Sequence, residues 1–438
     1  MKLGRIGAVV VVLSGWSASA GEPASGPTSA TEPASRPARL SIFNRLSPAQ
    51  LERFDRDRAA LARKVRRVVV PYPFVRGTFH MHSNLSHDSP GTVPEIIAAA
   101  KATGTRIVGF TEHPSRQINV IEANVKGWKD GVYFLAGVEG DGALYWPGRE
   151  GQEDLRFVCH PEEVPTFDRS RFVGMEIYNT HSDAKDEPTR RLLMAILLNL
   201  PAVQAHPDAA FESFLDYPAD FLDRYDRLTV EAPFAGIAAN DSHKNQSFKL
   251  VAMPDGTVEV FDYTSERVYK AEGVAAKILR AVFGPNRDVT EPTVMTELSL
   301  DPYERSMRHV GTFLQIGEIT EGTVRHALRS GRIVIGFEIV APLPSFGYWV
   351  ERDGRPAGTV GDHVPLQAGL VLRCALPAEA DIRIVRNGKP VHHARADTCS
   401  IAISEAGVYR MEAFVDLAGE RWPWVISNPI YIDKRGRS

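Results

Sequence analysis

The feature that most constrains the fold is an alternation of apolar, strand-like segments with helical segments from about residue 75 onward. A helix is predicted at residues 95–103, because Thr92 and Glu95 form a capping-box pattern, Pro94 lies near the first helical position and Gly104 follows the last. Strands that alternate with helices predict a parallel sheet or an α/β barrel. Their length and apolar character predict buried strands at residues 74–82, 106–111, 132–138, 156–159, 174–178 and 234–239.

The pattern changes after about residue 342, where short apolar stretches are separated by turn signals. The segment Arg386-Asn387-Gly388-Lys389 is typical of a two-residue β-hairpin turn. Regularly spaced short strands of this kind predict a small all-β sandwich of the immunoglobulin-like type. We therefore expect an α/β domain at residues 40–341 and a β-sandwich domain at residues 342–438.

The N-terminus has the pattern of a removable signal peptide. Lys2 and Arg5 precede an apolar stretch at residues 6–13, and Ala18-Ser19-Ala20 is a small-residue cleavage site. The apolar stretch is shorter than the roughly 20 residues of a membrane-spanning helix, so no membrane span is expected. Residues 21–39 are rich in Gly, Pro, Ala, Ser and Thr and predict a disordered linker. We expect a signal peptide at residues 1–20 and a periplasmic or secreted protein.

The composition argues against one class of function. Apolar residues make up 43% of the chain, charged residues 24%, and the net charge is −3 with no strongly basic region, so nucleic-acid binding is not expected. The three cysteines, Cys159, Cys374 and Cys399, are too few for a disulfide scaffold. A Cys374–Cys399 disulfide and three buried free thiols remain open alternatives. The oligomeric state also remains open.

Residues of the kinds that bind metal ions follow the predicted strand ends. His80 and His82 are two residues apart at the end of the first strand, so both side chains should face the same side. In α/β barrels the carboxyl ends of the strands meet on one face. Nitrogen and oxygen donors suit Zn, Mn or Fe, and the alternative is a set of unrelated core and loop histidines. The candidate ligands are His80, His82, Asp88, His113, Glu139, His160, Asp241 and His243.

Taken together, these motifs resemble those of the PHP (polymerase and histidinol phosphatase) family. Their order over residues 75–245 is His-x-His, Asp, Thr-Glu-His, Gly-Val-Glu, His-Pro and Asn-Asp-Ser-His. The resemblance implies a distorted seven-stranded, TIM-like (βα)7 barrel, two or three divalent metal ions, and hydrolysis of phosphate esters. Carried over by motif, it implies a first ion on His80, His82 and Asp241, a bridging Glu139, a second ion on His113 and His160, and a third on Asp88 and His243.

Two positions depart from the family pattern. Thr111-Glu112-His113 stands where Thr-Asp-His is commoner, so Glu112 is either a ligand or a residue that orients His113. In the loop Ser86-His87-Asp88, the imidazole of His87 competes with the carboxylate of Asp88 as the ligand, and the carboxylate is favoured.

Three further residues are candidates for contact with a substrate. Arg116 could hold a phosphate group through a bidentate contact, and His181 could protonate the leaving group. Lys244 could face the same opening of the candidate metal site. For all three, a surface charge near the rim is an equally open interpretation. His206, before Pro207, also resembles a strand-end ligand, but His160 fits the family order better.

These inferences favour an exported metal-dependent hydrolase that attacks a small phosphate ester with a metal-activated water. Two alternatives remain open. A PHP-like amidohydrolase would cleave a carbamate or carboxylic ester with the same nucleophile, and a non-catalytic protein would use its metal only for binding. A phosphatase needs cationic residues for the substrate anion, so the direction of Arg116 would help to separate the alternatives.

Overall fold

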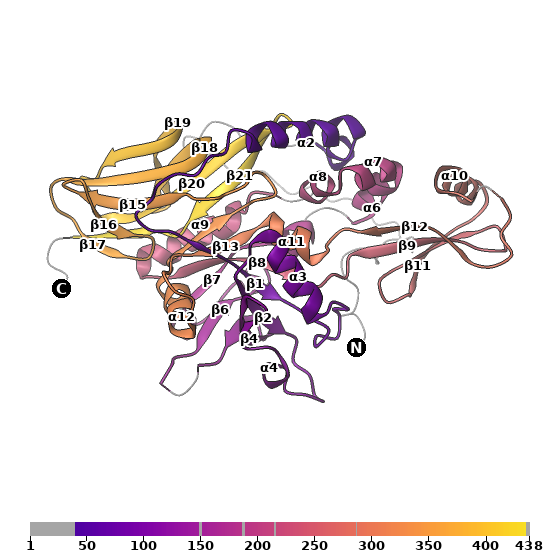
Figure 1. Cartoon of the computed structure of the whole chain (residues 1–438), viewed down its shortest axis with the longest axis horizontal. Helices are drawn as coiled ribbons and strands as arrows, with labels where there is room; N and C mark the ends of the chain where they lie inside the picture. Colours follow the sequence, from indigo (N-terminus) through magenta and orange to yellow (C-terminus); the bar gives the residue numbers. More distant parts are fainter. Residues whose placement is uncertain (1–39, 149–150, 186–188, 214–215, 286, 435–438) are drawn as a thin grey trace, which may run out of the picture.

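The computed structural model describes residues 40–148, 151–185, 189–213, 216–285 and 287–434. The predicted signal peptide (residues 1–20) and linker (residues 21–39) lie outside the described residues. Figure 1 shows a barrel at the lower centre, the C-terminal strands at the upper left and an arm of strands at the right. None of the helices in these ranges is long and apolar enough to cross a membrane.

Seven strands close into the central barrel. β1 pairs in parallel with β2 and β8, and the pairs β2–β4, β6–β7 and β7–β8 are also parallel. β5, however, is antiparallel to both β4 and β6. This departs from the uniform (βα)7 arrangement, because a short hairpin connection and not a helical crossover joins β4 to β5. In chain order the strands are β1 (Val75–Met81), β2 (Ile107–Glu112), β4 (Val132–Gly140), β5 (Ala143–Trp146), β6 (Leu155–Val158), β7 (Gly174–Asn179) and β8 (Ala235–Ser242).

Aromatic side chains fill the barrel interior and require glycines beside them. Phe79 and Trp146 pack edge to face, with ring centroids 5.9 Å apart. A Cβ atom at Gly109 would collide with the Phe79 ring, and one at Gly137 would lie 2.6 Å from Trp146. Only glycine leaves room for these rings at native packing density. Because the interior is a packed core, the polar chemistry is confined to the strand ends.

Some helices lie around the barrel, and others lie above it, beside the C-terminal strands and toward the arm (Figure 1). The predicted first helix is confirmed as α3 (Val93–Thr103), with the capping box of Thr92 and Glu95 present and Gly104 in the left-handed conformation at its C-terminus. Helix α11 (Tyr303–His309) packs against α3. The other helices are α1 (Ile42–Arg45), α2 (Pro48–Ala62), α4 (Val120–Ala123), α5 (Thr180–Lys185), α6 (Thr189–Leu198), α7 (Leu200–Ala205), α8 (Pro207–Glu212), α9 (Ala219–Glu231) and α12 (Glu321–Ser330).

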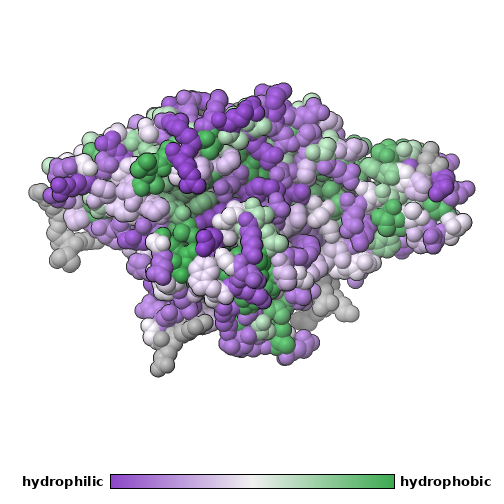
Figure 2. Space-filling model, in the orientation of Figure 1, coloured by the Kyte–Doolittle hydropathy of each residue, from purple (hydrophilic) through white to green (hydrophobic). Residues whose placement is uncertain are grey.

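An arm made of one antiparallel sheet and helix α10 (Gly273–Phe283) extends to the right in Figure 1. The alternating sequence pattern does not predict this arm. Helix α10 exposes Val274, Ile278 and Val282, which are spaced about one helical turn apart. Figure 2 shows hydrophobic patches within the otherwise hydrophilic surface of the arm. The sheet order is β11-β10-β9-β12, with β9 (Ser247–Ala252), β10 (Val258–Phe261), β11 (Arg267–Ala271) and β12 (Thr293–Ser299).

The C-terminal strands form an all-β region that is continuous with the barrel sheet. β1 pairs with β13, β13 with β14, and β14 with β21, so sheet hydrogen bonds cross the expected domain boundary at residues 341–342. The predicted hairpin is confirmed, because Asn387 and Gly388 have positive φ and Arg386 lies opposite Lys389. These pairings do not by themselves define an immunoglobulin-like sandwich. The strands are β13 (Gly311–Leu314), β14 (Ile333–Gly336), β15 (Gly347–Arg352), β16 (Arg355–Thr359), β17 (His363–Pro365), β18 (Leu370–Arg386), β19 (Lys389–Ala402), β20 (Gly407–Leu417), β21 (Glu420–Ser427) and β22 (Ile430–Asp433).

Side chains from distant parts of the chain join the barrel to the C-terminal region. Phe54 of α2 packs edge to face on Trp422 of β21, with ring centroids 5.3 Å apart. The Asn428 side chain accepts a hydrogen bond from the Gly236 backbone N–H of β8 and donates one to the Gly236 carbonyl. One hydrophobic core therefore includes residues from both ends of the chain.

Cys374 and Cys399 lie opposite each other on β18 and β19. Both are buried free thiols, as is Cys159. Of the two alternatives left open by the sequence, the structure contains the three free thiols.

Candidate metal centre

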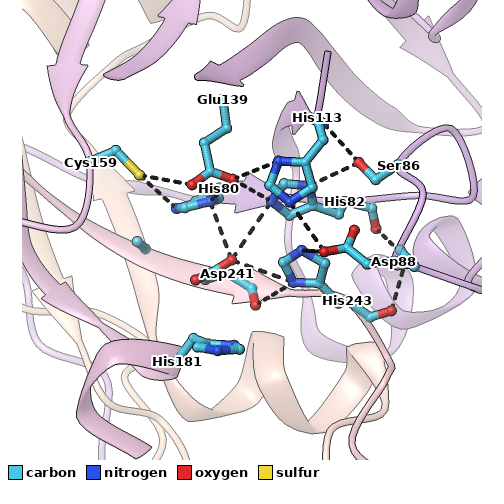
Figure 3. A network of polar contacts seen from close by, with 12 residues as sticks. His80, His82, Ser86, Asp88, His113, Glu139, Cys159, His181, Asp241 and His243 are labelled. Carbon is cyan, nitrogen blue, oxygen red and sulfur yellow. Dashed lines mark hydrogen bonds and ion pairs between the residues drawn. The ribbon is translucent and has the colours of Figure 1, made fainter. Parts of the chain in front are cut away.

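The candidate ligands come together at the carboxyl ends of the parallel barrel strands (Figure 3). They reach this face from five strands and the loops that follow them. β1 supplies His80 and positions His82 just beyond its end, and Asp88 lies in the next loop. The remaining candidate ligands are His113 after β2, Glu139 on β4, His160 after β6, Asp241 on β8 and His243 just after β8.

Three of the candidate ligands have a strained backbone conformation. His80, His160 and Asp241 have φ values of 61°, 45° and 45°, in the left-handed region that non-glycine residues rarely adopt. At His80 the register of β1 shifts between Phe79 and Met81 against both neighbouring strands. His80 and His82 therefore converge through a bulged backbone and not through simple strand alternation. Such strain persists where the surrounding structure holds it, often at functional sites.

Glu139 lies at the centre of the cluster and faces histidines with both oxygens. Its Oε2 atom is 3.2 Å from His80 Nε2, 3.4 Å from His82 Nε2 and 3.4 Å from His113 Nδ1. Its Oε1 atom is 3.0 Å from His160 Nε2. A carboxylate with its two oxygens in two different ligand groups has the geometry of a bridging ligand.

Asp241 lies on the opposite side of the cluster from Glu139 (Figure 3). Its Oδ1 atom is 3.3 Å from His80 Nε2 and 3.7 Å from His82 Nε2, and its Oδ2 atom is 3.5 Å from His160 Nε2. One ligand atom each from His80, His82, Glu139 and Asp241 lie within 4.8 Å of one another. This grouping matches the first-ion set that the resemblance implies.

His113 belongs to a different group from the one that the resemblance implies. Its Nε2 atom is 3.3 Å from Asp88 Oδ2, and that oxygen is 3.6 Å from His243 Nε2. His82, His113 and His243 also form a compact set of possible ligands. The geometry thus places His113 with Asp88 and His243 and beside Glu139 Oε2, whereas His160 lies beside the other oxygen, Glu139 Oε1.

The cluster leaves many buried polar atoms without a hydrogen-bond partner. Such atoms are rare in folded proteins, because each one loses its hydration without compensation. Here nitrogen lone pairs and carboxylate oxygens point toward one another, which is the donor set of a divalent cation. The atoms are His80 Nε2, His82 Nε2, Asp88 Oδ1, Glu139 Oε2, Asp241 Oδ1 and His243 Nε2. The residues therefore fit a multinuclear metal site.

Hydrogen bonds behind the ligands hold the imidazoles in the orientation that a metal requires. Glu176 Oε1 is 2.7 Å from His80 Nδ1, and a carboxylate only accepts, so Nδ1 carries the proton and Nε2 presents its lone pair. The second oxygen of Glu176 accepts from the backbone N–H of His160. The imidazole ring of His160 is held by Ser182, whose Oγ atom lies 3.0 Å from His160 Nδ1.

Glu112 orients the cluster from behind and is not grouped with the possible ligands. Its carboxylate accepts hydrogen bonds from Ser83 and Asn124 and from Ser86 Oγ at 2.6 Å. Ser86 Oγ in turn accepts from the backbone N–H of His113 and lies 3.0 Å from His82 Nδ1. Of the two roles left open by the sequence, the structure therefore places Glu112 in the orienting one.

The loop after β1 presents Asp88 and not His87 to the cluster. Asp88 Oδ2 is within 3.6 Å of two imidazole nitrogens. His87 is exposed, and its ring centroid is 5.2 Å from that of His113.

The electrostatics of the cluster favour ionised carboxylates. Burial raises the pKa of Glu139, but the neighbouring imidazole groups of His80, His160 and His82 outweigh this effect and hold the pKa well below the usual range. The pKa of Asp241 is lowered in the same way, by His80 and His160 against the effect of burial. Burial and the neighbouring His243 lower the pKa of His82 to about 3, which keeps this imidazole neutral. Ionised carboxylates beside a neutral imidazole form a site that attracts a cation.

The three residues expected to contact a substrate, His181, Arg116 and Lys244, differ in their position relative to this cluster. His181, on α5, lies below Asp241 and His243 in Figure 3, with its ring centroid 6.2 Å from that of His243. Arg116 is exposed on the loop that follows His113. Lys244 forms an ion pair with Glu95 at the start of α3.

His206 lies apart from the cluster. Its Nδ1 atom is 2.7 Å from Asp55 Oδ2 of helix α2, and both side chains are partly exposed. This ion pair accounts for His206 without a metal ion.

Two residues of the site were not singled out as functional from the sequence. Glu176 carries a signal only in hindsight, as an acidic residue inside the apolar strand β7. Cys159 precedes His160 at the end of β6, and its Sγ atom is 3.2 Å from Glu139 Oε1. The apolar character of cysteine makes such a residue look like ordinary core.

Comparison with protein-family models and with curated proteins found no match. Among solved structures, the chain is similar to a two-domain protein from Bacteroides vulgatus that is described as containing a predicted PHP-like metal-dependent phosphoesterase. The two chains are 12% identical, with a TM-score of 0.33 over 83% of this chain and 98% of that chain. At this TM-score the similarity carries no weight for function, which has to be inferred from the geometry of the site itself.

Proposed function

We propose that this protein is a metal-dependent hydrolase that cleaves phosphate esters at a site for two or three divalent ions. The observation that carries the proposal is the convergence of unpartnered, buried imidazole nitrogens and carboxylate oxygens at the barrel strand ends. Glu139 would bridge two ions, one of them also held by His80, His82 and Asp241 and the other by His160. Asp88, His113 and His243 would hold a third. We also propose, from the order of motifs, that the barrel is a distorted (βα)7 barrel of the PHP type.

Divalent ions at such a site supply a hydrolytic nucleophile near neutral pH and neutralise charge that develops on a phosphoryl oxygen. The protein's own residues fix the geometry. Glu176 and Ser86 hold the imidazoles of His80 and His82 so that their lone pairs face the cluster. His181, at the edge of the cluster, is our candidate for proton donation to the leaving group, and Arg116 for binding the substrate anion.

Export is a separate part of the proposal. It depends on the charged start, apolar stretch and small-residue cleavage site of residues 1–20, all of which lie outside the described residues. N-terminal sequencing of protein from its native host tests it: a mature chain that begins at Gly21 supports export, and an intact Met1 on cytoplasmic protein contradicts it.

One observation favours the second candidate function, hydrolysis of a carbamate or carboxylic ester. Lys244, a nearby cation, is already paired with Glu95, and Arg116 is exposed. If neither cation meets the substrate, the site has fewer groups that select a phosphate over a neutral ester. Such a site would still supply the same nucleophile.

A substrate screen distinguishes these functions. The full chain, reconstituted separately with Zn²⁺, Mn²⁺ and Fe²⁺, is assayed on phosphomonoesters, phosphodiesters, carboxylic esters and carbamates. Phosphate-ester turnover that falls at least about tenfold in Arg116→Ala would support the first function. Turnover of neutral esters alone would support the second. Metal binding without turnover of any substrate would support a non-catalytic, metal-dependent binding protein instead.

A further inference from the structure

Cys159 lies inside the candidate metal centre. The side chain is fully buried at the end of β6, and its Sγ atom is 3.2 Å from Glu139 Oε1 and 4.0 Å from His80 Nδ1. Figure 3 shows the sulfur directed toward Glu139 and His80. One ligand atom each from Cys159, Glu139, His160 and His80 lie within 4.8 Å of one another.

The local backbone explains how two consecutive residues reach the same site. Neighbouring residues of a regular strand point to opposite faces. His160 has a φ of 45°, which breaks this alternation immediately after Cys159. As a result, Cys159 Sγ and His160 Nε2 both approach Glu139 Oε1, at 3.2 Å and 3.0 Å.

A second observation concerns the donors next to Glu139 that the first ion would share with it. His80 Nε2 and Asp241 Oδ1 are buried without a hydrogen-bond partner, and the two side chains are 0% and 3% exposed. Both atoms face the space near Glu139, because His80 Nε2 is 3.2 Å from Glu139 Oε2 and 3.3 Å from Asp241 Oδ1. Through Glu139, the cysteine sulfur therefore lies next to buried ligand atoms that converge on one another and lack a hydrogen-bond partner.

We infer that Cys159 is a sulfur ligand of the ion that Glu139 and His160 bind, which makes this position selective for zinc over manganese. The inference rests on the proposed metal-dependent function. When the sulfur binds the ion, its S–H bond breaks, a metal–sulfur bond forms and the proton is released to solvent. Thiolate with imidazole is a common zinc donor set, whereas manganese prefers carboxylate, carbonyl and water oxygens.

The alternative role for Cys159 is a hydrogen bond from its S–H group to Glu139, with no bond to the ion. The two roles differ in an optical signal that is independent of turnover. Cobalt(II) replaces zinc in such sites and has visible ligand-field bands, and a cobalt–thiolate bond adds a charge-transfer band in the near ultraviolet. A hydrogen bond to Glu139 produces no such band.

The experiment is a Co²⁺ titration of the full metal-free chain, followed by absorption spectroscopy. We compare wild type with Cys159→Ala, Cys159→Ser and the control Cys399→Ala, which removes another buried thiol, on β19. We expect the near-ultraviolet band in wild type and Cys399→Ala and its loss in both Cys159 variants. Circular dichroism checks the fold, and the serine variant keeps nearly the same side-chain volume if alanine proves unstable.

A competition between Zn²⁺ and Mn²⁺ tests the predicted selectivity. We expect Cys159→Ala to shift the zinc-to-manganese affinity ratio by at least about tenfold toward manganese, which corresponds to about 1.4 kcal/mol. Visible cobalt bands without a charge-transfer band in wild type would overturn the Cys159 inference and leave the metal site intact. Absence of any bound cobalt in folded wild type would instead overturn the proposed function.

Discussion

Replacement of Glu176 by glutamine tests whether the hydrogen bonds behind the imidazoles prepare the site for metal. Glu176 Oε1 accepts from His80 Nδ1 at 2.7 Å, and Oε2 accepts from the His160 backbone N–H at 2.9 Å and from Asn179 Nδ2 at 3.0 Å. All three groups donate, so the carboxylate satisfies them only because it has no hydrogen of its own. Glutamine keeps the shape of the side chain but has an NH2 group, a hydrogen-bond donor, in place of one carboxylate oxygen.

Either orientation of the glutamine amide disturbs the site. If its NH2 group faces His160 and Asn179, donors oppose donors in a fully buried place. If the NH2 group faces His80, Nδ1 must accept, and the proton moves to Nε2, the atom that faces the cluster. Loss of an orienting partner behind a metal-binding histidine typically weakens metal binding 10- to 100-fold. We therefore expect Glu176→Gln to lose about 1.4 to 2.7 kcal/mol of metal affinity.

The protein offers a matched control outside the cluster. Glu212 Oε2 is 2.7 Å from His309 Nδ1, and both side chains are buried, as in the Glu176–His80 pair. Glu212→Gln should therefore cause a similar loss of stability but leave metal affinity within about threefold of wild type. The assays are isothermal titration calorimetry with Zn²⁺ or Co²⁺, and thermal unfolding of the metal-free proteins. Wild-type metal affinity in Glu176→Gln, or an equal loss in Glu212→Gln, would refute this reasoning.

Three more outcomes are expected. Glu139→Ala should reduce bound metal, measured by elemental analysis, from two or three ions to about one or none per chain, because the two ions that Glu139 would bridge are lost; full occupancy would contradict the bridging role. His82→Ala should lower kcat at least about 100-fold, roughly 2.7 kcal/mol, whereas His206→Ala should change it less than about tenfold; equal losses would mean that the wrong histidines were assigned. Burial raises the pKa of Glu412, but Arg410 and Arg383 outweigh it and lower the pKa below its ordinary value of 4.5. Because the folded pKa is depressed, this stabilisation is present above about pH 4.5 and is lost as the pH falls through the folded pKa. Melting temperatures measured across this range should fall with acid in wild type and less steeply in Glu412→Gln; parallel curves would contradict this assignment.

Local sequence patterns were sufficient for several elements and for the position of the candidate ligands along the chain. Helix α3 ends at Thr103, where Gly104 predicts, and begins directly after the cap Thr92, two residues before the predicted start at residue 95, because caps depend on residues within one helical turn. The Asn387-Gly388 hairpin forms because its turn requires positive φ at both residues. In the same way, ligand-type residues could be placed at strand ends from the chain order of apolar and polar segments alone.

Other features depended on contacts between distant segments. The sheet of the arm pairs β9 with β12, which are far apart in the chain. The antiparallel strand β5, by contrast, follows Asp141-Gly142, a local hairpin signal in which both residues have positive φ. The packing of Phe54 on Trp422 likewise brings together residues far apart in the chain. The barrel and the C-terminal strands are therefore more closely joined than a boundary at residue 342 suggests.

The sequence by itself determined the nitrogen and oxygen donors of the candidate site and their placement at the ends of the strands, because residue type and hydrophobic period are local properties. Tertiary structure decided how the donors group. His113 faces Asp88 and not His160, and the left-handed backbone at His160 directs Cys159 toward Glu139. These groupings depend on bulges and on strand register, which differ by single residues and leave no local sequence signal.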